Sequence, residues 1–371
     1  SIAKKLFGLL KANISLIFYI FISIPFGING LWFDLAITPF ILCSFFLLIK
    51  FINKPQQKYL FYCFLLLTIA FFIKQQTIWV YLWFLIVVVF YFKKQIKSVL
   101  PKIVISTIPL ILFSIFFLLF FTGKQILSEY IFWNFGFPFT IAIPGAGYNQ
   151  LPTFRQFIIV ISLFLIFTPS LLIKKIEIRL TLFVSLLLTA FAYRFDYFHL
   201  IPSLTILSLI AGENIIFILN RKKKYIIVTI FSFIVILYIS LRFLIINWQQ
   251  QIRFFESSII YTAKLITLIT SENDPIYIQN GPDQLYPLAG RLPVKPWSDE
   301  FPWYLEDTTM QKRVIDGLID KPPQYIVFQT YETGSDFNLG SYKPKLIVNY
   351  LDKNYSNYFQ ISNNLWLKKK I

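Results

Sequence analysis

Cysteine is nearly absent from this 371-residue sequence: only Cys43 and Cys63 occur, and both fall inside hydrophobic segments. So few thiols exclude a disulfide framework and a cysteine-based metal site. Histidine occurs once, as His199, and a single histidine without a partner at ligand spacing argues against a zinc centre. Residues 250–371 contain no glycine-rich phosphate loop and no GxSxG elbow, which excludes the enzyme classes that these motifs mark.

Acidic residues are scarce in residues 1–249, where 22 Lys and Arg residues stand against five acids. Residues 250–371 hold 13 of each kind, so the net charge of +17 belongs wholly to the first part. Basic residues between hydrophobic segments orient membrane helices, and this placement removes the support for nucleic-acid binding.

The composition is too apolar for a soluble protein, with 57% hydrophobic residues and 43 Phe. Hydrophobic segments recur from Ala12 to Trp248, and from Gln249 onward Pro, Gly, Asp and Glu return at ordinary frequencies. We therefore predict a polytopic α-helical membrane protein with a transmembrane domain at 1–249 and a soluble, extracytoplasmic α/β domain at 250–371.

Nine candidate membrane spans can be placed on the hydrophobic segments. They are 12–28, 31–49, 59–73, 77–92, 99–121, 156–173, 180–193, 199–219 and 225–247. Alternate connections carry 17 basic residues on one side and only four on the other, which are Lys74, Lys124, Arg155 and Arg194. The positive-inside rule then predicts a cytoplasmic N-terminus, and an odd number of spans predicts a tail outside the cytoplasm.

Ionisable side chains gather on the predicted outer side of the bilayer. Segment 59–92 is too long for one helix and must turn at "KQQT", Lys74 to Thr77. The segments that lead out to Lys74 and Arg194 have about 15 residues each, ~22 Å of helix, so both cations end below the outer headgroup plane. Lipid phosphate sits at that depth, but snorkelling of short helix ends is an equally ordinary explanation.

The tail has the pattern of a small α/β unit. We expect a helix at 252–270, a strand and turn at "DPIYIQNG", and a helix followed by a strand at "TTMQKRVIDGLIDKPPQYIVFQT". A further helix is expected at "KLIVNYLDKNY", and a closing hairpin with its turn at Asn363 and Asn364.

Three stretches carry a family resemblance. They are "AFFIKQQTIW" (70–79), "YRFDYFHLIPSL" (193–204) and the tail elements "YPLAGRLPVKPW", "PWYL" and "PPQYIVF". With the pattern of spans, they resemble the GT-C superfamily of polytopic glycosyltransferases, in particular its protein-mannosyltransferase-like and aminoarabinose-transferase-like branch. The resemblance covers nearly the whole chain through loose motifs.

The resemblance implies a transferase that takes a sugar from a polyprenyl-phosphate carrier and passes it to an extracytoplasmic glycan, lipid or protein acceptor. The expected location is the bacterial inner or plasma membrane. In the family an Asp or Glu in the first outer loop is the catalytic base, and that loop and its span have no counterpart here. We therefore expect the N-terminal hairpin and its acidic base upstream of Ser1. No cofactor is implied with certainty, and a divalent cation, Mg²⁺ or Mn²⁺, held by that loop stays open.

The resemblance and the residue chemistry assign four donor phosphate ligands: Lys74, Gln75, Arg194 and His199. Lys74 has a second interpretation as a water-exposed hairpin tip, and His199 one as a simple helix cap. Asp196 is expected to orient Arg194 or His199. If the chain is complete, the base must be one of three acids, Asp34, Glu129 or Asp196.

Three other functions stay open at this stage. An O-antigen polymerase or ligase is also polytopic and acts outside the cytoplasm, but is not expected to carry a large α/β tail. A transporter is expected to place ionisable residues near the bilayer midplane and to show repeated halves, and neither feature is evident. A non-catalytic membrane scaffold becomes the stronger alternative if the acidic loop is truly missing.

Overall fold

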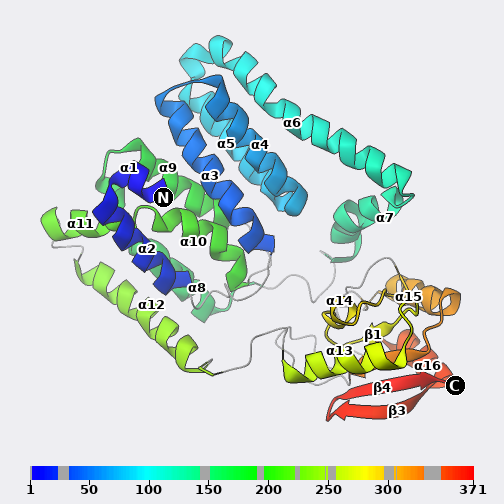
Figure 1. Ribbon diagram of the computed structural model, residues 1–371. Coiled ribbons are helices and arrows are strands. Elements are labelled where there is room, and N and C mark those ends of the chain that lie inside the picture. The colour runs from blue at the N-terminus through cyan, green and yellow to red at the C-terminus, as the bar shows by residue number, and fades with distance from the viewer. Residues whose placement is uncertain are drawn as a thin grey trace. The chain divides into compact units, whose positions relative to one another are not determined.

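The computed structural model describes residues 2–23, 33–142, 151–189, 196–221, 226–246, 248–249, 256–295, 305, 307–329 and 344–371. The chain divides into two compact units (Figure 1). The first comprises Ser1–Tyr130 and Gln150–Trp248, and the second comprises Ile131–Asn149 and Gln249–Ile371. The segment Ile131–Asn149 thus groups with the tail, whereas the predicted boundary at 249 assigned it to the first domain.

The first unit is helical throughout its described residues. Its elements are α1 (Ile2–Phe7), α2 (Leu9–Ser23), α3 (Phe33–Asn53), α4 (Gln57–Ile73), η2 (Gln75–Thr77), α5 (Ile78–Tyr91), η3 (Lys93–Gln95), α6 (Ile96–Gly123), α7 (Leu127–Ile131), α8 (Phe154–Leu165), η6 (Thr168–Leu172), α9 (Ile176–Leu188), η8 (Tyr197–Leu200), α10 (Ile201–Ser208), α11 (Ala211–Arg221) and α12 (Ile226–Ile246). One continuous core of apolar side chains runs from α1 to α12.

Four helical segments among the described residues are long and apolar enough to cross a membrane. They are Phe33–Asn53, Lys93–Gly123, Phe154–Leu172 and Thr229–Ile246. A fifth is obtained if the bent pair Tyr197–Ser208 and Ala211–Asn220 counts as one span. Leu9–Ser23, Gln57–Ile73 and Gln75–Tyr91 are apolar but shorter. The helices fit a polytopic membrane protein.

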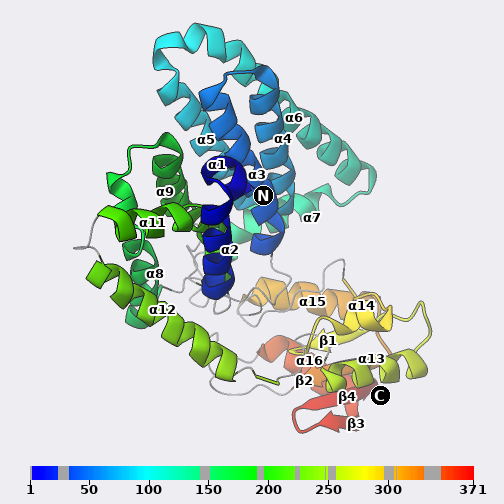
Figure 2. The same cartoon turned by 60° about the vertical axis from the view of Figure 1, so that its left-hand side comes forward.

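The predicted turn at Lys74–Thr77 is present. Helix α4 ends at Ile73, Lys74 is extended, and the short 3-10 helix η2 leads into α5. The rings of Phe64 on α4 and Tyr81 on α5 lie 4.6 Å apart, centroid to centroid, on opposite sides of this turn. Helices α4 and α5 therefore form a hairpin, with α3 packed beside α4 (Figure 1 and Figure 2).

The predicted continuous span at 199–219 differs from the structure, because the chain bends by 53° between Ser208 and Ala211. A bend frees backbone groups from the helical hydrogen-bond ladder, and in a membrane these groups need other partners. The Ser15 hydroxyl of α2 supplies them: Oγ donates to the Leu209 carbonyl at 3.0 Å and accepts from the Gly212 amide at 3.0 Å. Ser15 of α2 thus satisfies the two backbone groups that the bend leaves free.

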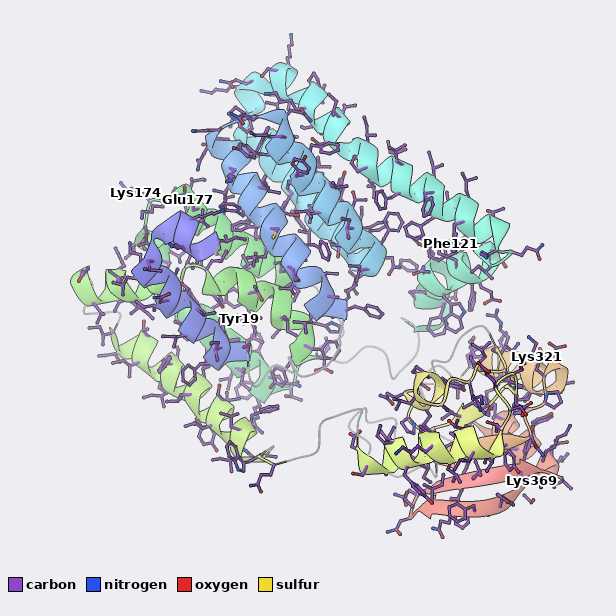
Figure 3. All side chains as sticks on the ribbon, viewed as in Figure 1. Tyr19, Phe121, Lys174, Glu177, Lys321 and Lys369 are labelled. Carbon is purple, nitrogen blue, oxygen red and sulfur yellow. The ribbon has the colours of Figure 1, made fainter. Side chains whose placement is uncertain are left out.

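The lysine-rich connections meet at one end of the first unit. Glu213 Oε1 accepts from Lys175 at 2.7 Å and from Lys11 at 2.9 Å. Lys102 Nζ donates to the Pro55 carbonyl at 2.6 Å. Asn53 donates to Glu177, which lies near Lys174 at the start of α9 (Figure 3). Connections assigned to the same membrane face therefore share one end of the helices.

The second unit is an α/β unit with a four-stranded sheet in its described residues. Its elements are the π-helical turns η4 (Phe132–Gly136) and η5 (Pro138–Ala142), then α13 (Ser257–Ile269), β1 (Tyr277–Gln279), α14 (Leu285–Ala289), α15 (Thr308–Asp320), β2 (Tyr325–Gln329), α16 (Lys345–Asn354), β3 (Tyr355–Ser362) and β4 (Leu365–Lys370). The strand order is β1-β2-β4-β3, with β1 and β2 parallel and the other pairs antiparallel.

Strand residues alternate between the two faces of this sheet. Ile278 and Val327 pack on one face with α13 and α14, whereas Tyr277 and Ile326 pack on the other with residues of α15 and α16. The described part of the predicted tail helices and strands is confirmed, and the turn of the final hairpin lies at Asn363 and Asn364.

We predict that Gly212→Ala destabilises the first unit. A Cβ at this position would lie 2.1 Å from the backbone oxygen of Lys11. Alanine gains ~1 kcal/mol in helix propensity, but a clash with backbone atoms cannot be relieved by a rotamer change and costs more. The melting temperature in detergent should fall by roughly 5 °C or more.

Gly123→Ala is the matched control, because nothing lies within 4 Å of a Cβ there. An unchanged melting temperature for Gly212→Ala would contradict the close packing of α11 on the first turn of α2.

Candidate functional site

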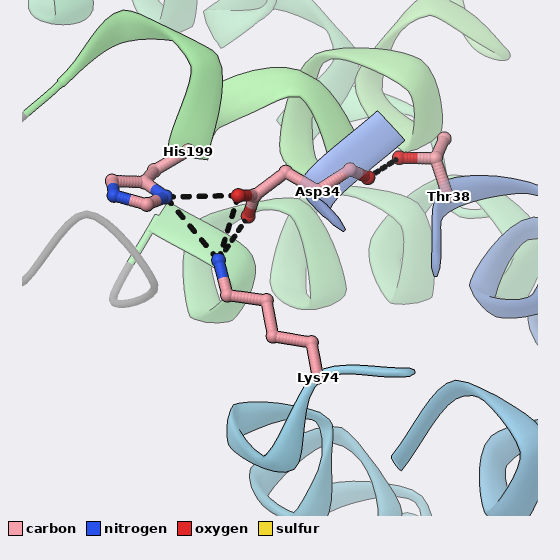
Figure 4. Close-up of polar contacts among 4 residues, drawn as sticks. All are labelled: Asp34, Thr38, Lys74 and His199. Carbon is pink, nitrogen blue, oxygen red and sulfur yellow. Dashed lines mark hydrogen bonds and ion pairs between the residues drawn. The ribbon is translucent and has the colours of Figure 1, made fainter. Parts of the chain in front are cut away.

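Three ionisable side chains from distant parts of the sequence meet at the other end of the first unit (Figure 4). Lys74 Nζ lies 2.6 Å from Asp34 Oδ1 and 2.7 Å from Oδ2. His199 Nδ1 lies 3.0 Å from Asp34 Oδ2 and 3.3 Å from Lys74 Nζ. We refer to Asp34, Lys74 and His199 as the outer cluster.

Each member of the outer cluster stands at the end of a helix. Asp34 lies in the first turn of α3, where the helix dipole favours a negative charge. Lys74 is the extended residue between α4 and η2, fixed by its own amide to the Ala70 carbonyl and by its carbonyl to the Thr77 amide. The amide of His199 donates to the Asp196 carbonyl at 3.2 Å, which holds the turn of η8.

Burial makes Asp34 and Lys74 depend on each other as charge partners. The Asp34 side chain is 2% exposed and that of Lys74 is 13% exposed, so both charges have lost most of their hydration. An isolated charge in such a place is costly, and the two groups compensate each other only as a pair. This burial excludes the interpretation of Lys74 as a water-exposed hairpin tip.

The imidazole of His199 has one nitrogen inside the cluster and one outside it. Nδ1 either donates a proton to Asp34 or accepts one from Lys74, and the tautomer decides which. Nε2 makes no hydrogen bond within the described residues, and the side chain is 15% exposed. The Phe198 ring packs 4.2 Å from the imidazole, centroid to centroid. Nε2 is therefore the ring nitrogen that the contacts within the cluster leave unused.

The hairpin beside Lys74 also holds polar atoms without a partner in the described part of the chain. These are Gln76 Oε1 and Thr77 Oγ1. Leaving a buried polar atom unsatisfied costs about 1–3 kcal/mol, so such atoms mark places where water or a ligand is expected to bind. Neither residue was among the predicted site residues, although both belong to the "KQQT" turn.

The other predicted site residues lie as follows. Gln75 is the first residue of η2, next to Lys74. Asp196 precedes η8, and the carboxylate that contacts the His199 ring is that of Asp34. Glu129 lies on α7 and takes no part in the contacts that join the outer cluster. Arg194 lies outside the described residues.

Metal binding has no evident place among the residues that the structure describes. No three side chains of His, Cys, Asp or Glu gather there into a group that could hold an ion. Comparison with known proteins adds no family, because no family model and no curated protein matches the chain. The function of the chain is therefore inferred from the outer cluster and from the sequence.

We predict strong coupling between Asp34 and Lys74 in a double-mutant cycle. Asp34→Asn or Lys74→Met alone leaves one buried charge without its partner and should cost about 3–5 kcal/mol. The double variant removes both charges and should recover a large part of that loss. Thermal or denaturant unfolding in detergent measures the effect.

The ion pair between Lys175 and Glu213, at the lysine-rich end of the first unit, provides the comparison for this cycle. The Lys175 side chain is 52% exposed, so Lys175→Met should cost less than about 1 kcal/mol. Additive losses in the double variant would show that the Asp34–Lys74 contact does not stabilise the protein.

Proposed function

We propose that the chain is a membrane glycosyltransferase that moves a sugar from a polyprenyl-phosphate carrier to an extracytoplasmic acceptor. The observation that carries the proposal is the outer cluster, in which a lysine and a histidine meet at the helix ends where sequence analysis expected a lipid phosphate. Ionisable residues buried in a membrane protein are costly and serve function as a rule.

The charges of the outer cluster suit a phosphodiester. Asp34 and Lys74 cancel each other, and a protonated His199 brings the cluster to a net charge of +1. A sugar phosphodiester of a polyprenol carries one negative charge, so it complements the protonated cluster. An Nε2–H of His199 is present in the protonated ring and also in the neutral tautomer whose Nδ1 accepts from Lys74, and it would donate to a phosphate oxygen.

The same groups would lower the barrier to transfer. The acceptor oxygen attacks C1 of the sugar and loses its proton to a carboxylate base, while the bond between C1 and the phosphate oxygen breaks. The bonding electrons stay on the phosphate, which leaves as a monoester with additional negative charge. Lys74 and His199 stabilise that developing charge more than the charge of the bound donor, which is the requirement for catalysis.

Asp34 is assigned an orienting role within this proposal. Both of its oxygens accept from Lys74, and one also contacts His199. A carboxylate held in this way fixes the position of both cationic groups, as orienting carboxylates do for catalytic histidines. Gln75 belongs to the same turn as Lys74, as do Gln76 and Thr77 with their unsatisfied oxygens, and all three are further candidate hydrogen-bond partners for the donor.

We further propose nine spans, a cytoplasmic N-terminus and a tail outside the cytoplasm. The contacts of Lys11, Lys102 and Lys175 lie at the same end of the helices, which supports this arrangement. With a different topology, these predicted inner connections would lie at both ends. The outer cluster joins residues from three predicted outer connections at the opposite end.

Reporter fusions test this topology. Alkaline phosphatase, which is active only outside the cytoplasm, should be active when fused after Ile371 and inactive when fused after Lys97. Green fluorescent protein, used at the same two positions, should give the reverse pattern. A fluorescent fusion after Ile371 would overturn the proposed orientation.

Donor turnover in membranes tests the function. With labelled polyprenyl-phosphate sugars, Lys74→Ala and His199→Ala should each lower transfer at least about 100-fold, because each removes a group that stabilises the leaving phosphate. Lys58→Ala is the control, since Lys58 lies on the lysine-rich side and is exposed. It should transfer within about twofold of the parent chain.

Two outcomes would contradict the proposal. Full turnover by Lys74→Ala at equal protein level would remove the phosphate role of the cluster. Turnover of pyrophosphate-linked glycans, with none of monophosphate-linked sugars, would favour a polymerase or ligase instead.

A further inference from the structure

The second unit exposes an apolar surface along α13 and the segment that follows α14. Leu268 is 83% exposed, Leu292 is 78% exposed and Tyr261 is 53% exposed. Tyr261, Lys264 and Leu268 recur at helical spacing, so they form one stripe on α13. We refer to Tyr261, Lys264, Leu268, Leu288 and Leu292 as the α13 surface.

A groove is built into the α13 surface. Its volume is about 380 Å³, and it is lined by Ile260, Ala263, Lys264, Thr267, Leu268 and Leu288. Lys264 is the one charged residue in this lining. A long lysine side chain can lay its methylene groups along an apolar surface and keep its ammonium group in the polar layer above.

The two halves of the α13 surface are held together by a buried arginine. Arg291 Nε donates to Thr270 Oγ1 at 2.9 Å, and its Nη2 donates to the Thr270 carbonyl at 2.8 Å. Its Nη1 donates to the Ala289 carbonyl at 3.0 Å. The guanidinium thus ties the C-terminal end of α13 to the end of α14. The groove residues Leu268 on α13 and Leu288 on α14 are therefore held in a fixed relation to each other.

The helices on the opposite face of the sheet differ sharply in their exposed residues. On α15 and α16 the exposed positions include Lys312, Asp316, Asp320, Lys345, Asp352 and Lys353. Both signs are present there, as on an ordinary hydrated surface. Ile319 and Leu346 are also exposed on these two helices, so the two sides of the sheet differ mainly in charge, which is more frequent on α15 and α16 than on α13.

The chain keeps the start of α13 close to the end of a candidate membrane span. Only ten residues, 247–256, separate the end of the candidate span α12 from the start of α13. Even fully extended, they reach no more than about 35 Å. Their sequence, "NWQQQIRFFE", contains Trp248, Phe254 and Phe255, and aromatic residues of this kind are enriched at membrane–water interfaces.

We propose that the α13 surface lies in the headgroup region of the membrane that α12 crosses, with Leu268 and Leu292 inserted among the upper acyl chains. A lipid surface fits better than a second protein because the short connection holds it within reach at all times. Lysine and tyrosine at the border of the apolar stripe suit the same location. The charged face of α15 and α16 then points toward water. This inference does not depend on the proposed glycosyltransferase activity.

Depth-dependent fluorescence quenching tests this placement. Cys43 and Cys63 are replaced by Ala, and single cysteines at Leu268, Leu292 or Lys321 are labelled with an environment-sensitive fluorophore. Lys321 is the control, because it is exposed and follows α15 (Figure 3). The full-length protein is reconstituted into vesicles with lipids that carry a nitroxide near the headgroup. Quenching at Leu268 and Leu292 should exceed quenching at Lys321 at least threefold.

The high exposure of Leu268 and Leu292 means that a cysteine at either position removes little packing. Quenching at Leu268 no greater than at Lys321 would overturn the proposal. Disulfide cross-linking between copies at Leu268, together with an absence of quenching there, would overturn it in favour of a second copy as the occupant. Equal, strong quenching at all three positions would also overturn it, because the contact would not be specific to one face.

Discussion

The ion pair between Asp34 and Lys74 fixes the geometry of one end of the helical bundle, where α3 begins and α4 ends. It ties the first turn of α3 to the end of α4, and its carboxylate also holds His199 at the start of η8. Because both charges are buried, neither helix end can move away without leaving an unpaired charge behind. The arrangement of the three helix ends, and with it the access of a ligand to His199 Nε2, therefore depends on this one contact.

The two ends of the bundle use charge differently. At the lysine-rich end, Glu213 is shared by Lys11 and Lys175, and the Lys175 side chain stays half exposed. That network anchors helices beside water and is open to screening by salt. At the other end the charges are fewer, more buried and mutually compensated. Among the described residues, the two ends thus differ in how far their lysines are removed from water: Lys175 is 52% exposed and Lys74 is 13% exposed.

Sequence reasoning predicted the elements that have a strong periodic or compositional signal. The turn at Lys74–Thr77, the tail helices and the final hairpin were found because their patterns are local. The contact of Asp34 with His199 joins residues 165 positions apart, and nothing local encodes it. Topology placed Asp34, Lys74 and His199 on one face, but only packing of α3, α4 and η8 selects Asp34 over Asp196 as the carboxylate on the imidazole. The bend at Leu209 was missed for the same reason: its free backbone groups are satisfied by Ser15, far away in the sequence.

The hydrogen bonds of Ser15 to the bend at Leu209 have a consequence for membrane assembly. Until α2 stands beside the bend, the Leu209 carbonyl and the Gly212 amide face hydrocarbon without a partner. The segment from α10 to α12 is therefore poorly suited to exist on its own in a bilayer. During biosynthesis α2 enters the membrane before this segment, so the Ser15 hydroxyl is already present when the bent helix arrives.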